Sequence, residues 1–253
     1  MKHRINTLGF ALSLTLICLF LRETWLFIPL LVLVSIIFIT ALSLGVLFMQ
    51  FNYFLKSTTR LKDNKCLLTF DDGPDPDNTP KILDILAKHN IKAVFFLIGE
   101  KVEQHPELTK RIKNEGHLLG NHSHTHNNFM SMFSKAKLRE EIDKTQQSIR
   151  TVTDSEVQYF RPPIGYTNPK YAVVLRERKL KCVGWTLRSY DSVFTDPLKL
   201  EQRLLTKIKP GNIVLLHDNL EVTAAALDSF ISKAKTNGII FASSSEINTI
   251  IDA

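Results

Sequence analysis

The sequence predicts an α/β fold, a closed or nearly closed (β/α) barrel of about seven strands, preceded by one or two N-terminal transmembrane helices. Two observations predict this fold. From Cys66 onward, short strand-like runs alternate with helical runs, a pattern typical of a parallel sheet. Before that point, two long runs are almost wholly apolar. We therefore expect a membrane anchor over residues 1–55, a basic juxtamembrane linker over 56–65 and an α/β domain over 66–253.

The two apolar runs are candidate membrane spans, with helices expected at about residues 5–21 and 25–49. At ~1.5 Å of rise per residue, the second run exceeds the ~30 Å hydrocarbon core of a bilayer and can cross it. The first run is shorter and follows basic residues like a signal peptide, but no small-residue cleavage site comes after it. A two-helix hairpin with a turn at Arg22-Glu23 is the favoured interpretation.

Basic residues at both outer ends of this hairpin bear on its topology. They are Lys2 and Arg4 at one end, and Lys56, Arg60, Lys62 and Lys65 at the other. The positive-inside rule would place both ends, and with them the α/β domain, in the cytoplasm of a bacterial cell. A single span would instead place the domain outside the cell membrane. The protein is thus expected in the bacterial inner or cell membrane, with the side of the domain left open.

The formal net charge of +7 is compatible with an anionic neighbour, such as phospholipid headgroups or an acidic glycan, but a basic juxtamembrane collar and a solvated surface are the favoured explanation. Nucleic acid is not an expected partner, because no basic patch is interleaved with aromatic residues. Membrane lipid is an expected partner. Three cysteines form no recognisable disulfide framework.

The elements of the α/β domain follow from hydrophobic periodicity and from turn-forming residues between the runs. The expected strands are Cys66–Asp71, Lys92–Ile98, His117–Asn121, Gln158–Arg161, Lys181–Thr186, Asn212–His217 and Gly238–Ala242. The expected helices are Thr79–His89, Lys101–Glu115, Lys135–Arg150, Asn168–Arg178, Pro197–Ile208, Thr223–Lys235 and Ser243–Ile251. In a barrel of this type the active site lies at the C-terminal ends of the strands, so polar residues there are candidates for chemistry.

The first strand of the domain ends in two adjacent carboxylates, Asp71 and Asp72, followed at once by Gly73-Pro74. Successive side chains of a strand point in different directions, so the pair can have different roles. One can hold a metal while the other transfers protons. A phosphatase-type aspartyl nucleophile is disfavoured, since such sites place their two aspartates one residue apart.

Three histidines, His122, His124 and His126, fall within five residues after the third expected strand. Burying three imidazoles is costly unless they have chemical work to do. His122 and His126 are four residues apart, face one way on a helical turn, and can share a cation with one carboxylate. Two histidines and an aspartate, with open positions left, are typical of a catalytic metal site.

Two more strand ends carry ionisable side chains, Arg161 and His217. A guanidinium at the first position can hold a carboxylate base in its ionised form, and the rigid loop over 162–166 can direct backbone N–H groups at an oxyanion. A histidine just past an apolar strand is suited to general acid catalysis. Taken alone, that histidine could equally be structural.

Together these motifs resemble the polysaccharide deacetylase family, the NodB-homology domain of carbohydrate esterase family 4. The resemblance covers about residues 66–252. It depends on Thr69-Phe70-Asp71-Asp72-Gly73-Pro74, His122-Ser123-His124-Thr125-His126, Arg161-Pro162-Pro163-Ile164-Gly165-Tyr166 and Leu215-Leu216-His217. It implies a distorted (β/α) barrel and a hydrolase that removes N-acetyl groups from an amino-sugar-containing glycan, by means of metal-activated water. Peptidoglycan, a chitin-like glycan or another polysaccharide would be the substrate.

The resemblance also implies roles for the motif residues. Asp71 would be the general base, oriented by Arg161. Asp72, His122 and His126 would bind one divalent cation, usually zinc, with cobalt or another divalent ion as the alternative. His124 matches a variable position of its motif and is left out of the metal set.

Further roles follow from the same resemblance. His217 would protonate the leaving amine, and Asp191 would orient that histidine. The substrate-binding residues implied are Pro163, Ile164, Tyr166 and Leu215. Leu215 would line the pocket for the acetyl methyl group, and a backbone N–H near Ile164 would face the oxyanion.

One segment, Trp185 to Ser192, departs from the family pattern, which often has two aspartates followed by a tryptophan. Asp191 matches the second aspartate, but Arg188 stands in place of the first and Ser192 in place of the tryptophan. The expected catalytic set is kept while the surface that stacks against a glycan changes. The identity of the substrate therefore stays open.

Three alternatives also stay open. A domain facing the cytoplasm would more plausibly deacylate a lipid-linked amino sugar at the inner leaflet than a wall polymer. A non-catalytic glycan-binding module could use the same fold, although the presence of every expected catalytic side chain disfavours it. A metal phosphoesterase is compatible with the acidic and histidine residues alone.

Overall fold

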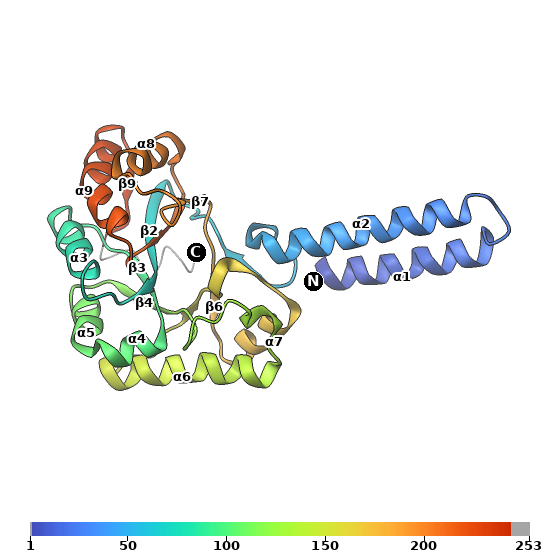
Figure 1. Ribbon diagram of the computed structural model, residues 1–253, viewed down its shortest axis with the longest axis horizontal. Coiled ribbons are helices and arrows are strands. Elements are labelled where there is room, and N and C mark those ends of the chain that lie inside the picture. Colours follow the sequence, from blue (N-terminus) through green and yellow to red (C-terminus); the bar gives the residue numbers. More distant parts are fainter. Residues whose placement is uncertain (1, 244–253) are drawn as a thin grey trace.

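The computed structural model describes residues 2–243 and has two parts, a long helical hairpin and an α/β domain (Figure 1). The expected helix over Ser243–Ile251 lies, apart from its first residue, outside the described residues.

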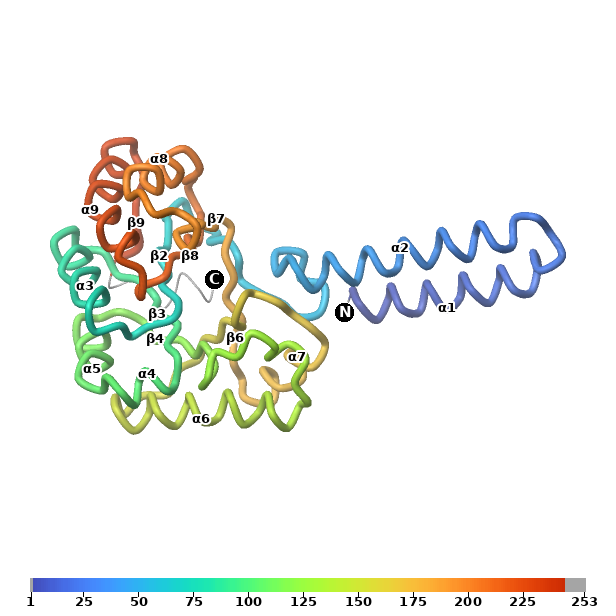
Figure 2. The backbone as a smooth tube through the Cα atoms, in the orientation of Figure 1, coloured from blue at the N-terminus to red at the C-terminus, as the bar shows by residue number. Residues whose placement is uncertain are grey.

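The hairpin consists of α1 (Lys2–Phe20) and α2 (Phe27–Leu47), joined by a short turn. Both helices are long and apolar enough to cross a membrane, and only 6% of each span is buried within the protein. They lie side by side and project away from the domain, with Phe10 and Phe38 stacked at 4.2 Å between ring centroids (Figure 2). Short N-terminal spans of this kind are compatible with a membrane anchor and with a signal sequence.

The base of the hairpin is packed onto the domain. Thr167 donates hydrogen bonds to the backbone carbonyls of Val46 and Gly45, at 3.1 and 2.9 Å. The ring of Tyr53 passes so close to Gly45 that a Cβ there would lie 2.3 Å from it. A short 3₁₀ helix, η1 (Met49–Phe51), follows α2, and Met49 is buried. The anchor is therefore in direct contact with the segment that follows the Arg161 loop.

The domain is built on one curled sheet, in the order β1-β6-β5-β4-β3-β2-β8-β7, in which every described pair of strands is parallel. Its strands are β1 (Ser57–Thr58), β2 (Lys65–Gly73), β3 (Val94–Leu97), β4 (Leu118–Asn121), β5 (Tyr159–Phe160), β6 (Lys181–Val183), β7 (Leu187–Arg188) and β8 (Ile213–His217). A further strand, β9 (Ile240–Phe241), pairs with the start of β2. The predicted (β/α) barrel fold is confirmed.

Helices cover the outer face of this sheet (Figure 1). They are α3 (Thr79–Lys88), α4 (Gly99–Gln104), α5 (Pro106–Asn114), α6 (Lys135–Thr153), α7 (Pro169–Glu177), α8 (Pro197–Lys207) and α9 (Glu221–Thr236). Two 3₁₀ helices, η2 (Met130–Met132) and η3 (Pro163–Gly165), lie in the loops after β4 and β5.

Three elements differ from the sequence-based prediction. The single helix expected over Lys101–Glu115 is divided into α4 and α5, because Pro106 lacks an amide N–H and disfavours helical backbone at the residue before it. The strand expected over Lys181–Thr186 ends at Val183, and β7 begins only at Leu187. The segment expected as a linker over 56–65 contributes β1, which pairs with β6 at an edge of the sheet.

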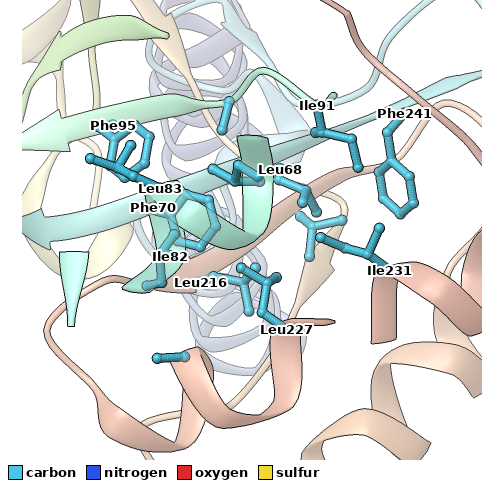
Figure 3. Close-up of a cluster of buried hydrophobic side chains, with 14 of the residues drawn as sticks. Leu68, Phe70, Ile82, Leu83, Ile91, Phe95, Leu216, Leu227, Ile231 and Phe241 are labelled. Atoms are coloured by element: carbon cyan, nitrogen blue, oxygen red, sulfur yellow. The ribbon is translucent and has the colours of Figure 1, made fainter. Parts of the chain in front are cut away.

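Alternation along β2 explains how the core and the polar site share one strand. Leu68 and Phe70 point outward and pack with Ile82 of α3 and Leu227 of α9 in the main core (Figure 3). Leu67 belongs to a separate cluster on the inner face of the sheet. Since side chains alternate between faces, Thr69 and Asp71 also point inward, where the strand reaches its C-terminal end.

Candidate active site

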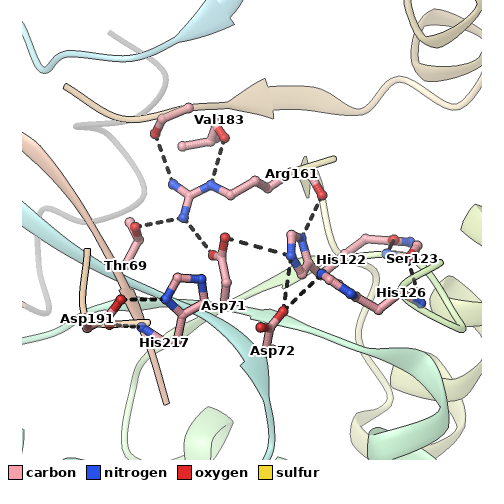
Figure 4. Close-up of polar contacts among 12 residues, drawn as sticks. Thr69, Asp71, Asp72, His122, Ser123, His126, Arg161, Val183, Asp191 and His217 are labelled. Carbon is pink, nitrogen blue, oxygen red and sulfur yellow. Dashed lines mark hydrogen bonds and ion pairs between the residues drawn. The ribbon is translucent and has the colours of Figure 1, made fainter. Parts of the chain in front are cut away.

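Asp71 is held by a buried arginine. Nη1 of Arg161, at the end of β5, lies 2.7 Å from Asp71 Oδ1 and also donates to Thr69 Oγ1 at 2.8 Å (Figure 4). Its other nitrogens donate to the carbonyls of Val183 and Gly184, at 3.0 and 2.9 Å. The side chain of Arg161 is fully buried, and burial lowers its pKa against the opposing charge of Asp71. The guanidinium thus fixes one carboxylate oxygen and leaves Oδ2 facing the pocket.

The second carboxylate, Asp72, reaches the same pocket through a break in the strand. The pairing register of β2 with β3 shifts between Asp71 and Gly73, and Asp72 has a φ of +74°. A bulge of this kind redirects a side chain that strict alternation would place on the opposite face. Lys101 holds the strained segment by donating to the Asp72 carbonyl at 2.7 Å.

Asp72, His122 and His126 form a cluster of three possible metal ligands, with one donor atom of each within 4.8 Å of the others. Oδ1 of Asp72 lies 3.1 Å from His126 Nε2 and 3.4 Å from His122 Nε2. This oxygen is buried and makes no hydrogen bond with any described residue. An oxygen of that kind between two imidazole nitrogens fits a divalent cation, which would satisfy all three donors together.

The imidazole of His122 is oriented for cation binding through Nε2 by a hydrogen bond of its Nδ1. Nδ1 lies 2.8 Å from the backbone carbonyl of Arg161 and donates its proton there, which leaves Nε2 facing Asp72 and available to a cation. Burial lowers the pKa of His122, but the charges of Asp71 and Asp72 outweigh it and raise the pKa overall. The aspartates and His122 are therefore electrostatically complementary even without a cation.

The loop that carries the histidines is held by Glu141, which the sequence analysis did not identify. Its buried carboxylate on α6 accepts from the backbone N–H groups of His124 and Thr125, at 3.1 and 2.9 Å. Ser123 Oγ accepts from the His126 N–H at 3.1 Å, and both of these residues have positive φ. The sequence carried no signal for Glu141, because one acidic residue on a charged helix is unremarkable until its loop contact is known.

His217, at the end of β8, faces the pocket from another wall and is held by Asp191. Oδ1 of Asp191 lies 2.8 Å from His217 Nδ1, while Oδ2 accepts from the His217 backbone N–H at 2.7 Å and from Thr223 Oγ1 at 2.8 Å. Burial opposes the charged imidazole, but the hydrogen bond and charge of Asp191 raise the pKa of His217 to about 9. The imidazolium form therefore predominates at neutral pH.

These groups line one small pocket of about 150 Å³. Its lining residues are Asp71, Asp72, His122, His126, Ile164, Gly165, Trp185, Arg188, Leu215 and His217. Of the four expected substrate-binding residues, Ile164 and Leu215 lie on its wall. Pro163 and Tyr166 are not among its described lining residues, although η3 holds them next to Ile164. Trp185 and Arg188 also line the pocket, and the motifs alone had not indicated this.

Comparisons with known proteins agree with this geometry. The polysaccharide deacetylase family matches residues 58–183. A peptidoglycan-N-acetylglucosamine deacetylase of Bacillus cereus is 34% identical over 71% of this chain and 86% of that protein. A second such deacetylase of B. cereus is 36% identical over 69% of this chain, which spans 64% of that protein. The deacetylase PgdA of Listeria monocytogenes is also 36% identical, but this chain spans only 40% of it.

Solved structures show the same fold. The Bc1960 peptidoglycan N-acetylglucosamine deacetylase superposes with a TM-score of 0.72 at 31% identity, covering 78% of this chain and 93% of that one. BA3943 of Bacillus anthracis, described as a pseudoenzyme of carbohydrate esterase family 4, superposes with a TM-score of 0.70 at 32% identity, covering 77% and 68%. The chain belongs to the polysaccharide deacetylase family, carbohydrate esterase family 4.

Proposed function

We propose that this protein is a metal-dependent hydrolase that removes N-acetyl groups from an amino-sugar-containing glycan. One observation carries the proposal. A single pocket joins a carboxylate held by arginine, a three-ligand cation site and a histidine with a raised pKa. Amide hydrolysis needs a base, an electrophile and an acid, and these groups provide one of each.

In the proposed reaction, the oxygen of a water molecule attacks the carbonyl carbon of the N-acetyl group. Asp71 Oδ2 accepts the proton that the water loses, while Arg161 keeps Oδ1 fixed. His217 then donates its proton to the amide nitrogen, and the C–N bond breaks to give acetate and a free amine. A divalent cation on Asp72, His122 and His126 would act as a Lewis acid toward the amide carbonyl.

The remaining expected residues would position the substrate. Leu215, at the wall of the pocket, would contact the acetyl methyl group. Ile164 has a φ of +62° in η3, a conformation that turns the backbone of this loop. We propose that an N–H of this loop faces the oxyanion, with Pro163 making the loop rigid and Tyr166 contacting the sugar beyond the pocket.

Zinc is the ion that we propose for the site. Two imidazoles and one carboxylate, with open positions for water and substrate, match the ligand preference of catalytic zinc, and cobalt accepts the same donors. Metal analysis of the purified chain, followed by chelation and reloading with Zn²⁺, Co²⁺ or Mg²⁺, tests this proposal. Activity restored by Mg²⁺ alone would exclude it, since magnesium prefers oxygen ligands.

Catalysis is favoured over a non-catalytic binding role on the same fold. The fold by itself does not decide between these roles, because BA3943 shares it and is described as a pseudoenzyme. In this chain, however, the base is hydrogen-bonded to its arginine, the acid to its aspartate, and the three cation ligands lie together in the same pocket. A glycan-binding module has no need of that set.

We also propose that α1 and α2 insert into a bacterial cell membrane as a hairpin. Their length, apolar composition and exposure support insertion, and the basic residues at both outer ends favour a domain on the cytoplasmic side. Protease treatment of spheroplasts and of inverted vesicles tests this orientation. Degradation of the domain in intact spheroplasts would place it outside the cell.

The central experiment is an acetate-release assay with the metal-loaded full chain. It compares chito-oligosaccharides, peptidoglycan fragments and lipid-linked N-acetylated sugars, with Asp71→Asn as the inactive control. Release from at least one substrate by the natural chain, and from none by the variant, is expected. Absence of release from the whole panel despite stoichiometric metal would instead support a binding module.

A further inference from the structure

A second, larger cavity lies beside the active-site pocket. This groove of about 610 Å³ is bounded on one side by the end of α2, at Leu47 and Phe48, and on another by β7 and the loop after it. Trp185 and Arg188 line both the groove and the active-site pocket. A ligand in the groove could therefore extend past these two side chains into the site.

The groove is strongly cationic. Among residues 2–243, its lining includes no acidic side chain and five positively charged ones: Arg60, Arg188, Arg203, Lys207 and Lys209. Lys207 and Lys209 are exposed, and neither forms an ion pair within residues 2–243. Unpaired cations gathered in a concave surface attract an anion of matching size.

One wall of the groove is fixed by contacts within the protein. Arg203 on α8 donates to the backbone carbonyls of Ser189 and Arg188, at 2.9 and 3.1 Å. The ring of Tyr190 contacts two guanidinium groups, with Arg203 Cζ at 4.5 Å and Arg188 Cζ at 5.2 Å from its centroid. This wall is therefore organised before any ligand binds, which lowers the entropic cost of binding.

The position of the groove indicates where its anion comes from. Leu47 ends the apolar helix α2, and both Leu47 and Phe48 are exposed, at 49% and 40%. If the hairpin spans a bilayer, these residues lie at the level of the lipid phosphates. The groove then opens at that level, and it adjoins the active-site pocket at Trp185 and Arg188.

We propose that the groove binds the phosphate of a lipid-linked amino sugar, whose N-acetylated sugar occupies the active-site pocket. This inference rests on the proposed deacetylation and names its substrate class: an N-acetylated amino sugar 1-phosphate esterified to a lipid. In such a molecule the phosphate is attached directly to the sugar. That short separation matches two cavities that share Trp185 and Arg188 as a common wall.

Binding without turnover tests the inference. The ligands are N-acetylglucosamine 1-phosphate carried on a farnesyl chain and the farnesyl glycoside of the same sugar without phosphate. Titrations use the metal-loaded full chain with Asp71→Asn, in a neutral detergent free of phospholipid. We expect the double variant Lys207→Gln/Lys209→Gln to bind the phosphorylated ligand about tenfold more weakly, the effect of two exposed ion pairs, and the glycoside equally well.

The matched control is Lys81→Gln/Lys199→Gln, which should change neither affinity. It removes two exposed lysines that lie outside the groove and form no ion pair with the part of the chain that the structure describes. The inference would be overturned if the groove variant, Lys207→Gln/Lys209→Gln, bound both ligands more weakly by an equal factor, or if it bound both as tightly as before. Competition by micellar phosphatidylglycerol or inorganic phosphate as strong as by the phosphorylated ligand would also overturn it, because the groove would then serve headgroups or free phosphate.

Acetate release from the same two ligands by the natural chain separates this inference from the proposed function. If neither ligand releases acetate but the binding preference and its loss are observed, the deacetylase proposal fails and the groove assignment stands. If acetate is released and the groove variant has no selective effect on binding, the deacetylase proposal stands and the groove assignment fails.

Discussion

Replacement of Asp191 by asparagine provides the sharpest test of the acid role of His217. The carboxylate accepts from His217 Nδ1 at 2.8 Å and raises the pKa of the imidazole, against burial, to about 9. A rise from 6.5 to about 9 corresponds to about 3 kcal/mol in favour of the imidazolium, at ~1.4 kcal/mol per pH unit. The variant loses the hydrogen bond and charge of Asp191, so the pKa of His217 should fall toward 6.5, with burial lowering it and the charges of Asp71 and Asp72 partly opposing that effect.

The loss of activity should therefore depend on pH. At pH 5.5 most of the His217 side chains remain protonated in both proteins, and kcat/KM should be similar. At pH 7.5 a pKa near 6.5 leaves roughly a tenth protonated, so kcat/KM should fall about tenfold relative to the natural chain. The measurement is kcat/KM for acetate release between pH 5 and 10, at equal metal loading. The fall in kcat/KM on the alkaline side of the profile should begin at a lower pH in the variant.

The control for this experiment is Thr223→Val, which removes one hydrogen bond to Asp191 Oδ2 but keeps the carboxylate charge. Its pH profile should follow that of the natural chain. A bound cation lowers the pKa of His217 in all three proteins, so the comparison is between variants under one metal condition. An equal loss at pH 5.5 and 8.5 in Asp191→Asn would refute the argument, since it would reflect misfolding or misalignment rather than proton supply.

The free energy of unfolding of the metal-free chain should also depend on the protonation of His217. The pKa of His217 is higher in the folded than in the unfolded chain, so its stabilisation is complete below pH 6.5 and is lost as pH rises through about 9. Urea unfolding should therefore show a difference between the natural chain and Asp191→Asn that narrows from pH 6 to pH 9.5. A difference that is constant over this range would contradict the linkage.

Three further predictions concern the other groups of the site. Asp71→Asn should lower kcat by about 10²-fold or more while the metal content, measured by elemental analysis, stays unchanged; loss of metal would mean that Asp71 is a ligand. His126→Ala should lower the bound metal well below one ion per chain with little change in the circular dichroism spectrum, and full retention would exclude it from the ligand set. Arg161→Met leaves Asp71 buried without its cation and should cost about 3–5 kcal/mol in urea unfolding, whereas the double variant Arg161→Met/Asp71→Asn should recover part of that loss; no recovery would show that the pair is not coupled.

Residue types and their order along the chain determined much of the fold and of the site. The alternation of strand-like and helical runs from Cys66 onward predicted a parallel sheet closed into a barrel. The strands β2, β3, β4 and β8 lie where short apolar runs occur in the sequence. Asp71, Arg161 and His217 were predictable as neighbours because each lies at or near the C-terminal end of a strand, and parallel strands direct these ends to one edge. These are local properties, which a single sequence carries.

Other features depended on contacts between distant segments. Simple alternation would have placed Asp72 on the opposite face from Asp71, and only the bulge in β2 brings both carboxylates into one pocket. Glu141 holds the histidine loop from a helix that follows it, so nothing in its own neighbourhood indicated the role. β1 could not be predicted from its own residues either, because it is only two residues long and becomes a strand by pairing with β6, far away in the sequence.

The sequence by itself thus determined the reacting groups, because their side-chain chemistry and their positions at strand ends depend only on neighbouring residues in the chain. The tertiary structure alone decided the surroundings of those groups. It brought the end of α2 next to β7, so that Leu47 and Arg188, far apart in the chain, line one groove. Packing between distant segments creates such a cavity, and its shape and charge exist only once the chain has folded.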